Sequence, residues 1–208
     1  MAAVMQDVLK QNKVVHNFNG GPSILPKIVF EQASEAILNY NNSGLSILEM
    51  GHRKPEFQGI MDEARSMVKE LMQLDADHEV LFLHGGASTQ FMQVPMNLLN
   101  EKDTAAYADT GVWISKALAE AKVFGNVDVV CSSKDKNYNY IPKDFTVPGN
   151  AQYFHITTNN TIYGTQYQTI PIVNVPLIAD MCSDLFIRKR DFNSFGLIYA
   201  GAQKNMGS

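Results

Sequence analysis

The sequence predicts an α/β fold of three layers, αβα, in which helices cover both faces of a mainly parallel sheet. The first observation is an alternation that repeats along most of the chain: a short apolar run, a polar loop, then a segment with helical spacing. Strands that alternate with helices are typical of parallel sheets. The second is size, because 208 residues with 45% hydrophobic side chains are enough for one well-cored domain.

Two helices are expected before the first strand. The Gly/Pro-rich loop that begins at Asn17 leads to Pro26, which suits the first turn of a helix. Apolar residues then recur at helical spacing until residues 41–44 stop the helix: Val29, Ala33, Ala36, Ile37 and Tyr40. The longer helix that follows has an apolar face, expected to be core, made of Phe57, Ile60, Met61, Ala64, Met67, Val68 and Leu71.

Six strands are expected, and all are short apolar runs that end at polar or glycine residues. They are Val80–Leu83, Ala105–Ala108, Val127–Val130, Tyr153–Thr157 and the runs around Ile178 and Ile198. A helix over Gln90–Leu99, broken or bent at Pro95, should follow the first strand. Another helix should follow Trp113 and continue through Lys122.

Polar clusters follow most of these strands, at residues 84–90, 109–113, 157–161, 180 and 203–204. In open α/β sheets, ligands bind beyond the carboxyl ends of the parallel strands. The clusters therefore indicate one ligand site at a single edge of the sheet.

Composition excludes several classes of function. The net charge of -4 gives no electrostatic reason to expect nucleic acid, and Arg188-Lys189-Arg190 is too short a basic run to form a binding face. Two cysteines, Cys131 and Cys182, are too few for a disulfide framework and suit a reducing compartment. No apolar run reaches the length of a membrane span, and residues 1–13 are too polar for a secretion signal. A cytoplasmic protein without a metal site or membrane contact is expected.

Asp180 and Lys204 suggest the chemistry of the site. Each follows an apolar run that reads as a buried strand, so a carboxylate and an amine lie at strand ends. A lysine beside the core can become nucleophilic. Enzymes that use pyridoxal phosphate (PLP) hold the aldehyde on a lysine as a Schiff base and keep the pyridine nitrogen protonated with an aspartate. Alternatively, Asp180 caps a loop and Lys204 is solvated.

The stretch His84-Gly85-Gly86-Ala87-Ser88-Thr89 joins a strand to the start of a helix. Backbone N–H groups in a glycine turn and the positive end of a helix dipole bind phosphate, and Ser88 and Thr89 can add hydroxyl donors. An ordinary tight turn with a Ser/Thr N-cap is the alternative. The stretch lacks a Walker lysine, which makes a nucleoside triphosphatase loop a poor interpretation.

Three other features are weaker signals. Trp113, the only tryptophan, follows a strand-end glycine and could cover a planar ring, or it could be a core residue. Thr161 could bind a ligand or satisfy its own backbone. His52-Arg53 could bind an anionic group through the guanidinium fork, or remain an exposed surface pair.

Taken in order, several motifs resemble the phosphoserine aminotransferase family, which comprises class V PLP enzymes of fold type I. They are NFNGGPSILP, SILEMGHRKPEF, VLFLHGGASTQF, ADTGVW, NNTIYG, IADMCSD and FGLIYAGAQKN, and they extend from about Asn17 to Ser208. AGAQKN together with GHR is specific to this family within its class. The resemblance implies the large, PLP-binding domain of fold type I.

The resemblance also implies roles for individual residues. Lys204 would bind the cofactor aldehyde and shuttle a proton, and Asp180 would pair with the pyridine nitrogen. Trp113 would stack on the ring, with Thr161 near its phenolic oxygen. The residues that would help to hold the phosphate are Ala87, Ser88 and Gln203, and those that would meet the substrates are Gly20, His52 and Arg53.

Two departures from the family pattern concern side chains. Relatives often have Gly-Arg or Gly-Cys where this chain has Ala87-Ser88, and some have serine in place of Gly20. A larger departure concerns length. Family members continue with an antiparallel strand and a C-terminal small domain, and a partner subunit completes the phosphate site in a homodimer. We therefore expect an extension over residues 1–16, an incomplete large domain over 17–208, and no small domain.

The implied activity is transamination between L-glutamate and 3-phosphohydroxypyruvate, which gives 2-oxoglutarate and O-phospho-L-serine in serine biosynthesis. It could extend to a related phosphorylated 2-oxo acid of pyridoxine biosynthesis. Two alternatives stay open. One is another class V enzyme such as a cysteine desulfurase, although neither Cys131 nor Cys182 looks placed as its reactive cysteine. The other is an inert or merely cofactor-binding fragment.

Overall fold

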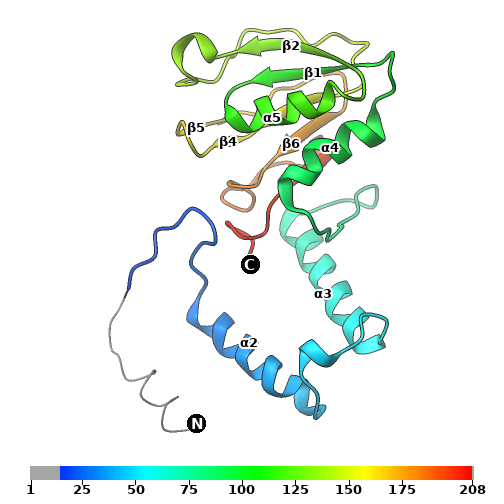
Figure 1. Ribbon diagram of the computed structural model, residues 1–208, viewed down its shortest axis with the longest axis vertical. Coiled ribbons are helices and arrows are strands. Elements are labelled where there is room, and N and C mark those ends of the chain that lie inside the picture. The colour runs from blue at the N-terminus through cyan, green and yellow to red at the C-terminus, as the bar shows by residue number, and fades with distance from the viewer. Residues whose placement is uncertain (1–14, 208) are drawn as a thin grey trace.

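The computed structural model describes residues 15–207, and its centre is a sheet of five parallel strands (Figure 1). The strands lie in the order β2-β1-β3-β6-β7. Their bounds are Thr104–Asp109 (β1), Asn126–Ser132 (β2), Phe154–Thr157 (β3), Leu177–Asp180 (β6) and Leu197–Tyr199 (β7). Every pair of neighbours is parallel, so all five carboxyl ends lie at one edge. The predicted fold class is confirmed.

A short antiparallel hairpin follows β3 directly. Its strands, β4 (Asn159–Asn160) and β5 (Thr165–Gln166), contain two residues each and lie outside the main sheet. The hairpin begins where β3 ends, and it therefore stands at the carboxyl edge of the sheet.

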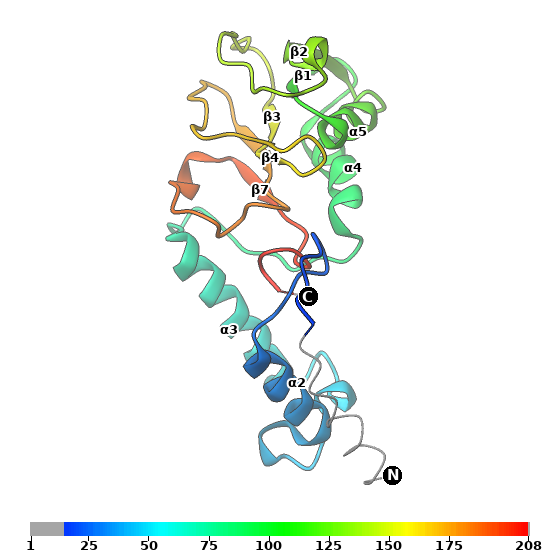
Figure 2. The ribbon, with the colours of Figure 1, turned by 90° about the vertical axis from the view of Figure 1, so that its left-hand side faces the viewer.

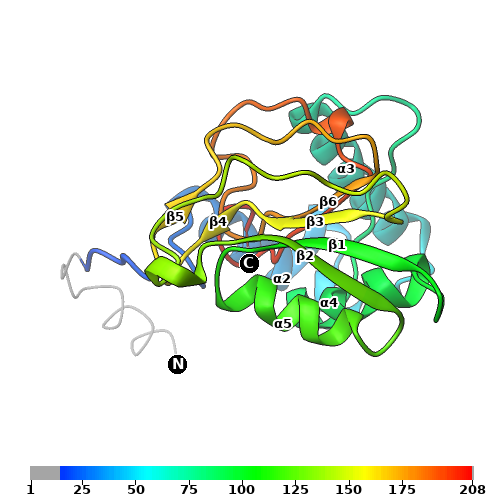
Figure 3. The same cartoon turned by 90° about the horizontal axis from the view of Figure 1, so that it is seen from above.

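One face of the sheet is covered by two helices, α4 (Gly86–Leu98) and α5 (Val112–Ala121) (Figure 3). The buried side chains between them and the strands include Ile114 and Ala117 of α5 and Tyr107 and Ile178 of the sheet. Pro95 lies within α4, but the helix continues to Leu98 without a break. The two helices predicted after Val80–Leu83 and after Ala105–Ala108 are therefore present. Helix α4 begins four residues earlier than the predicted start at Gln90.

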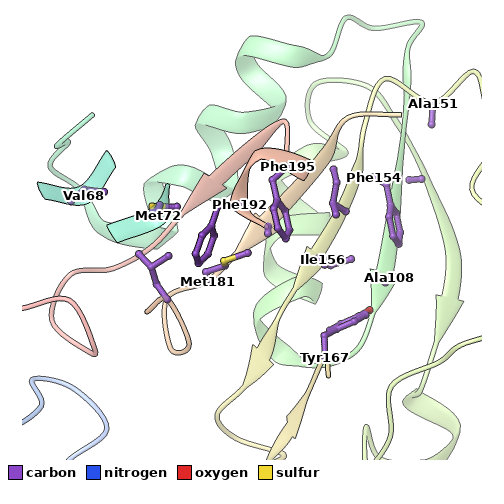
Figure 4. Packing of buried hydrophobic residues seen from close by; sticks show 14 residues of the cluster. Val68, Met72, Ala108, Ala151, Phe154, Ile156, Tyr167, Met181, Phe192 and Phe195 are labelled. Atoms are coloured by element: carbon purple, nitrogen blue, oxygen red, sulfur yellow. The ribbon is translucent and has the colours of Figure 1, made fainter. Parts of the chain in front are cut away.

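The opposite face carries the second apolar cluster (Figure 4). Successive strand residues point to opposite faces, so Phe154 and Ile156 project here while Tyr107 and Ile178 project toward α4 and α5. This face is covered by the end of α3 (Pro55–Met72), through Val68 and Met72, and by loops. Two single-turn 3-10 helices, η3 (Lys134–Lys136) and η4 (Phe192–Ser194), interrupt these loops.

The first predicted strand, Val80–Leu83, is wrong: this segment is not a strand. Leu81 is 71% exposed and Leu83 is 60% exposed. An apolar extended segment becomes a strand only when its N–H and C=O groups pair with a neighbour, and within residues 15–207 no strand lies beside it. The sheet therefore has five strands where six were expected.

The two N-terminal helices form as predicted, but the face of the longer one that was expected to be core is only partly buried. Helix α2 (Lys27–Asn39) continues into the 3-10 turns η1 (Tyr40–Asn42) and η2 (Ile47–Glu49), and none of its residues is buried. Along α3 only Val68 and Met72 are buried, while Met67 is 53% and Leu71 is 66% exposed. The reason is position, because α2 and most of α3 extend away from the sheet (Figure 1).

Most of the expected N-terminal extension, residues 1–14, lies outside the described residues, as does Ser208. The division of the chain into an extension and an incomplete large domain stays a prediction. Within residues 15–207, no helix combines the length and apolarity that crossing a membrane requires.

A polar cluster is buried between the sheet and α4 and α5. The hydroxyl groups of Tyr107 and Tyr153 are 2.9 Å apart, and His155 Nε2 lies 3.0 Å from the hydroxyl of Tyr199. The His155 ring stacks on Tyr107 with ring centroids 5.0 Å apart. Complete burial lowers the pKa of His155 to about 3, because the imidazolium form would lose its hydration.

The buried imidazole should make folding stability depend on pH. The pKa of a histidine in the unfolded chain is about 6.5, so between pH 6.5 and about 3 the unfolded state binds a proton that the folded state does not. The free energy of unfolding should therefore fall with falling pH, by up to about 1.4 kcal/mol per pH unit from this group. Urea unfolding of wild type and His155→Gln from pH 7 to 4 measures the difference; parallel pH profiles for the two proteins would contradict the assignment.

Candidate functional site

The carboxyl edge of the sheet gathers residues from distant parts of the chain. Asp180 is the last residue of β6, and Lys204 lies in the turns that follow β7. Because β6 and β7 are neighbours, with Asp180 opposite Tyr199 in the register, their two following loops lie side by side. The structure therefore brings the predicted carboxylate and the predicted lysine to one edge.

Asp180 is a buried carboxylate, 5% exposed. The backbone N–H of Cys182 donates a hydrogen bond to its Oδ1 at 3.0 Å. Burial raises the pKa of Asp180, while the hydrogen bonds from Cys182 and the positive charge of Lys204 act in the opposite direction. A cationic group placed against this carboxylate would favour its ionised form. Asp180 therefore does cap the loop that follows β6, as the alternative interpretation expected, and its carboxylate is buried.

Cys182 also links the Asp180 loop to the loop of Lys204. The backbone N–H of Gly201 donates to Cys182 Sγ at 3.1 Å. A Cβ atom at position 201 would lie 2.7 Å from Oε1 of Gln203, so the backbone approaches this side chain closely. Lys204 itself is half-buried, whereas Gln203 is exposed.

The N-terminal loop packs on the Lys204 segment (Figure 2). The backbone N–H of Ser23 donates to the carbonyl of Gln203 at 3.0 Å, and its hydroxyl donates to the carbonyl of Lys204. A Cβ atom on Gly21 would lie 3.2 Å from Cγ of Lys204. The family resemblance implied a substrate-binding role for Gly20, but a Cβ atom on Gly20 would meet nothing within 4 Å. The contacts with the Lys204 segment are made by Gly21 and Ser23.

A cavity of about 420 Å³ lies beside Lys204. Residues 23–26 and Val29 line one side, and residues 204–207 line the other. The cavity is therefore formed by the first and last described segments of the chain, which meet at the carboxyl edge. Among the candidate site residues Lys204 lines this cavity, whereas Asp180 and Trp113 do not.

The start of α4 supplies the candidate phosphate site. Gly85 adopts a positive φ of 97°, and helix α4 begins at the next residue with no side-chain cap. The backbone N–H groups of its first turn, which includes Ala87 and Ser88, are therefore available to an anion at the positive end of the helix dipole. A Cβ on Gly85 would lie 2.3 Å from Oγ1 of Thr89, whose hydroxyl donates to the carbonyl of Gly85 at 2.7 Å. Glycine is thus required at position 85.

Trp113 and Thr161 contact each other across the site. The indole N–H of Trp113, in the first turn of α5, donates to Oγ1 of Thr161 at 3.3 Å. Thr161 lies in the turn of the β4–β5 hairpin and is exposed. Trp113 is half-buried at the margin of the cluster that also contacts Ala87 and Cys182. Lys116 Nζ stands 4.7 Å from the centre of the indole ring.

His52 and Arg53 do not join this group within one chain. Both are exposed, in the turn before α3. Figure 1 shows this turn at the outer end of α3, away from the segment that carries Lys204. Any contact of these two side chains with a ligand held at Lys204 therefore requires a second molecule or a rearrangement.

The residues at the edge fit PLP, the cofactor that the resemblance implies. The group needs an amine, a buried carboxylate, an aromatic cover and anion-binding backbone, and the structure places Lys204, Asp180, Trp113 and the start of α4 at the same edge. Thr157 Oγ1, opposite Asp180 in the register, is buried without a hydrogen-bond partner among the described residues. The site therefore offers polar groups that a ligand can satisfy.

Comparison with known proteins agrees with these observations. Residues 15–208 match the family model described as aminotransferase class-V. The phosphoserine aminotransferase of Flavobacterium johnsoniae is 56% identical over 193 residues, which cover 92% of this chain and 54% of that protein. The phosphoserine aminotransferase of Bacteroides fragilis is 54% identical over 191 residues, with 92% and 53% covered. The chain thus spans about half the length of these curated relatives.

The solved structures that resemble this chain include several phosphoserine aminotransferases. Phosphoserine aminotransferase from Bacillus circulans subsp. alkalophilus superposes with a TM-score of 0.89 at 46% identity, covering 92% of this chain and 54% of that one. PLP-bound phosphoserine aminotransferase from Trichomonas vaginalis gives a TM-score of 0.86 at 33% identity, with 94% and 56% covered. Another similar structure, with a TM-score of 0.91 and 47% identity over 94% of this chain and 55% of that one, concerns the Schiff base in phosphoserine aminotransferase. The fold-type I assignment and the PLP dependence of the family are thereby confirmed.

Proposed function

Since the chain belongs to the class V aminotransferase family, we propose that the protein is a PLP-dependent phosphoserine aminotransferase. It would interconvert L-glutamate and 3-phosphohydroxypyruvate with 2-oxoglutarate and O-phospho-L-serine. The observation that carries the proposal is the meeting of a buried carboxylate, Asp180, and a half-buried amine, Lys204, at one sheet edge. Close relatives named phosphoserine aminotransferase support the choice of substrates.

When bound, PLP supplies an aldehyde for the amino group and a ring that accepts electrons from the substrate. Lys204 would hold that aldehyde covalently and carry the proton that moves on the substrate during transfer. Asp180 would keep the ring nitrogen protonated, and its burial makes this interaction strong because little water competes. The Trp113 indole would cover one face of the ring.

Ala87 and Ser88 would bind the cofactor phosphate through the first-turn N–H groups of α4, with Gln203 assisting from the Lys204 loop. Thr161, which already accepts a hydrogen bond from Trp113, would lie near the phenolic oxygen of the ring. Ser23 and Gly21 contact the Lys204 segment directly, so the substrate-binding role proposed for Gly20 is best extended to this whole loop.

We also propose a homodimer in which His52 and Arg53 of one subunit complete the site of the other. Both residues are exposed, and the turn that carries them lies away from the Lys204 segment of its own chain (Figure 1). Apolar side chains of α2 and η2 are also exposed, including Leu38 at 76% and Leu48 at 77%. A cytoplasmic location and a second role in pyridoxine biosynthesis belong to the same proposal, as does the absence of membrane and nucleic-acid partners.

A cysteine desulfurase is less well supported by the structure. That reaction needs a reactive thiolate. Burial raises the pKa of the Cys131 thiol to about 11 and that of the Cys182 thiol to about 12. The hydrogen bond from the Gly201 N–H to Cys182 Sγ acts in the opposite direction, but burial has the larger effect on this pKa. Burial therefore disfavours the thiolate form of both cysteines at neutral pH.

A half-reaction tests the proposed function. The chain is loaded with PLP, treated with L-glutamate, and followed by its visible absorbance and by the release of 2-oxoglutarate. Loss of the visible band with stoichiometric 2-oxoglutarate, followed by recovery with 3-phosphohydroxypyruvate, is expected for a ping-pong transaminase. If the band forms but neither glutamate nor the phosphorylated 2-oxo acid changes it, the substrates proposed here are wrong.

Arg53→Ala should raise KM more than it lowers kcat. Binding of an anionic group by a guanidinium is present in both the ground state and the transition state, so its loss weakens binding uniformly. A charged hydrogen bond contributes about 1.5–3 kcal/mol, which corresponds to a KM increase of roughly 10- to 100-fold. The control is Arg65→Ala, because Arg65 lies in the same region and pairs with Asp62 at 2.8 Å. Steady-state kinetics of the two variants are compared with those of wild type. A fall in kcat with unchanged KM would contradict uniform binding.

A further inference from the structure

Thr158 joins two elements of the site through hydrogen bonds. It follows the last residue of β3 and is fully buried. Its backbone N–H donates to the carbonyl of Asp180 at 3.0 Å. Its hydroxyl lies 3.1 Å from the same carbonyl and also within hydrogen-bonding distance of Oδ1 of Asp184. The backbone of Asp180 is thus held by a residue whose side chain also contacts a second buried carboxylate.

That second carboxylate is paired with a buried arginine. Asp184 Oδ2 lies 2.9 Å from Arg190 Nη2, and the two side chains are 0% and 6% exposed. Gln166 Nε2 donates to the same Oδ2 at 3.1 Å. Arg190 Nη2 also donates to the carbonyl of Tyr167 at 3.3 Å. The ion pair therefore ties the loop after β6 to strand β5 and the residue after it.

The hairpin and the loop are joined a second time through Asn159 and Ser183. Asn159 Nδ2 donates to Ser183 Oγ at 2.8 Å, and the Ser183 hydroxyl donates to the carbonyl of Asn159 at 3.1 Å. The turn of the same hairpin carries Thr161, which accepts the hydrogen bond from Trp113. Hydrogen bonds therefore lead from Asp184 through Thr158 to the Asp180 backbone, and through Gln166 to the hairpin whose turn makes the Trp113–Thr161 contact.

A contribution to folding stability does not by itself explain why the Asp184–Arg190 ion pair is buried. Burying two charges costs several kcal/mol per ion, and apolar replacements of such pairs are often neutral or stabilising. The other ion pairs of the described residues, such as Lys69–Glu79 at 2.7 Å, have at least one exposed partner. The pair that is wholly buried is the one whose contacts lead to the site.

We propose that the Asp184–Arg190 ion pair is a positioning device, which fixes the hairpin of residues 158–166 relative to Asp180. Through it, the Trp113–Thr161 contact and the carboxylate that faces the cofactor nitrogen are held in one geometry. Asp184 and Arg190 are positioning residues and touch neither cofactor nor substrate. The part of the proposal that concerns PLP rests on the proposed function; the part that concerns geometry does not.

Trp113 provides the readout, because a chain with one tryptophan gives a single indole N–H signal in a nitrogen–proton correlation spectrum. Asp184→Asn and Thr158→Val should move this signal and increase backbone hydrogen exchange in residues 158–166, both without PLP. Glu79→Gln is the control for Asp184→Asn, because it removes the exposed Lys69–Glu79 pair. Ser133→Ala is the control for Thr158→Val, because the Ser133 hydroxyl is also buried, has no partner among the described residues and follows the edge strand β2. An indole signal that is the same in wild type, Asp184→Asn and Thr158→Val would overturn the proposal.

The double variant Asp184→Leu/Arg190→Met separates positioning from stability. Apolar replacement should bring Tm back to near the wild-type value. The indole signal should remain displaced, and the Kd for PLP should rise at least tenfold. If Tm, the indole signal and the Kd all return to wild-type values, the pair contributes only stability and the proposal is wrong. If wild type does not bind PLP at all, the proposed function fails, while the indole and exchange data still decide the role of the ion pair.

Discussion

Lys204→Ala is expected to abolish covalent retention of PLP. In the function proposed here, half-buried Lys204 is the nucleophile that meets the aldehyde, and it lines a cavity of about 420 Å³. Wild type treated with PLP and then borohydride should keep the cofactor through gel filtration, and peptide mapping should place it on Lys204. The variant should lose the visible absorbance band and retain no cofactor after the same treatment. Turnover should fall below detection, because the proposed function assigns both the covalent bond and the proton transfer to Lys204.

Lys102→Ala is the matched control, since Lys102 is an exposed lysine in the loop before β1. It should keep both the band and the retained cofactor. A visible band that persists in Lys204→Ala, or a reduced label that maps to another lysine, would remove Lys204 from the role proposed here. If wild type also retains no cofactor while remaining folded, the described residues lack a part that binding requires.

The sequence predicted the sheet well because its signal is local. Runs such as Ala105–Ala108 and Tyr153–Thr157 are buried on both faces, so they read as continuous apolar stretches wherever they occur. The residues just after such runs lie at the carboxyl edge, since parallel strands end at one edge. Asp180 and Lys204 could therefore be placed at this edge from the order of residues along the chain, whereas their roles stay predictions.

The same reasoning failed where burial depends on a partner. Val80–Leu83 is as apolar as the true strands, but within residues 15–207 it has no neighbour with which to pair. The face of α3 shows the same effect, because only Val68 and Met72 reach the sheet. An apolar pattern indicates that a surface is suited to burial, and it does not say which element covers it.

Contacts between segments that are distant along the chain could not be predicted from the sequence either. Gly21 and Ser23 touch the Lys204 segment across some 180 positions, and no local spacing indicates such a meeting. No sequence pattern pairs Asp184 with Arg190, yet their side chains form a buried ion pair. Arg190 belongs to the basic run that composition dismissed as too short to bind nucleic acid. Its role depends on the partner that the fold places beside it.

Asp180→Asn is expected to separate cofactor binding from catalysis. Asparagine has the same shape, and its side-chain oxygen can still accept the hydrogen bond that the Cys182 N–H donates at 3.0 Å to Oδ1. What it loses is the negative charge that would keep the ring nitrogen of PLP protonated. Removing a preorganised electrostatic partner from a buried site lowers turnover on the order of 10²–10³-fold, and we expect a loss of at least that size. The covalent bond to Lys204 does not depend on this charge and should still form.

The comparison with Asp180→Glu completes the argument. Glutamate keeps the charge but is one methylene longer, in a position that is only 5% exposed, so the carboxylate must move and overpacking costs about 1–3 kcal/mol. If charge is the decisive property, Asp180→Glu should be less stable than Asp180→Asn in urea unfolding and yet turn over faster. Equal turnover in Asp180→Asn and wild type would show that the ring nitrogen needs no carboxylate partner. If the turnover of Asp180→Asn falls only in proportion to a loss of PLP retention, Asp180 is a cofactor-binding residue without the electrostatic role proposed for it.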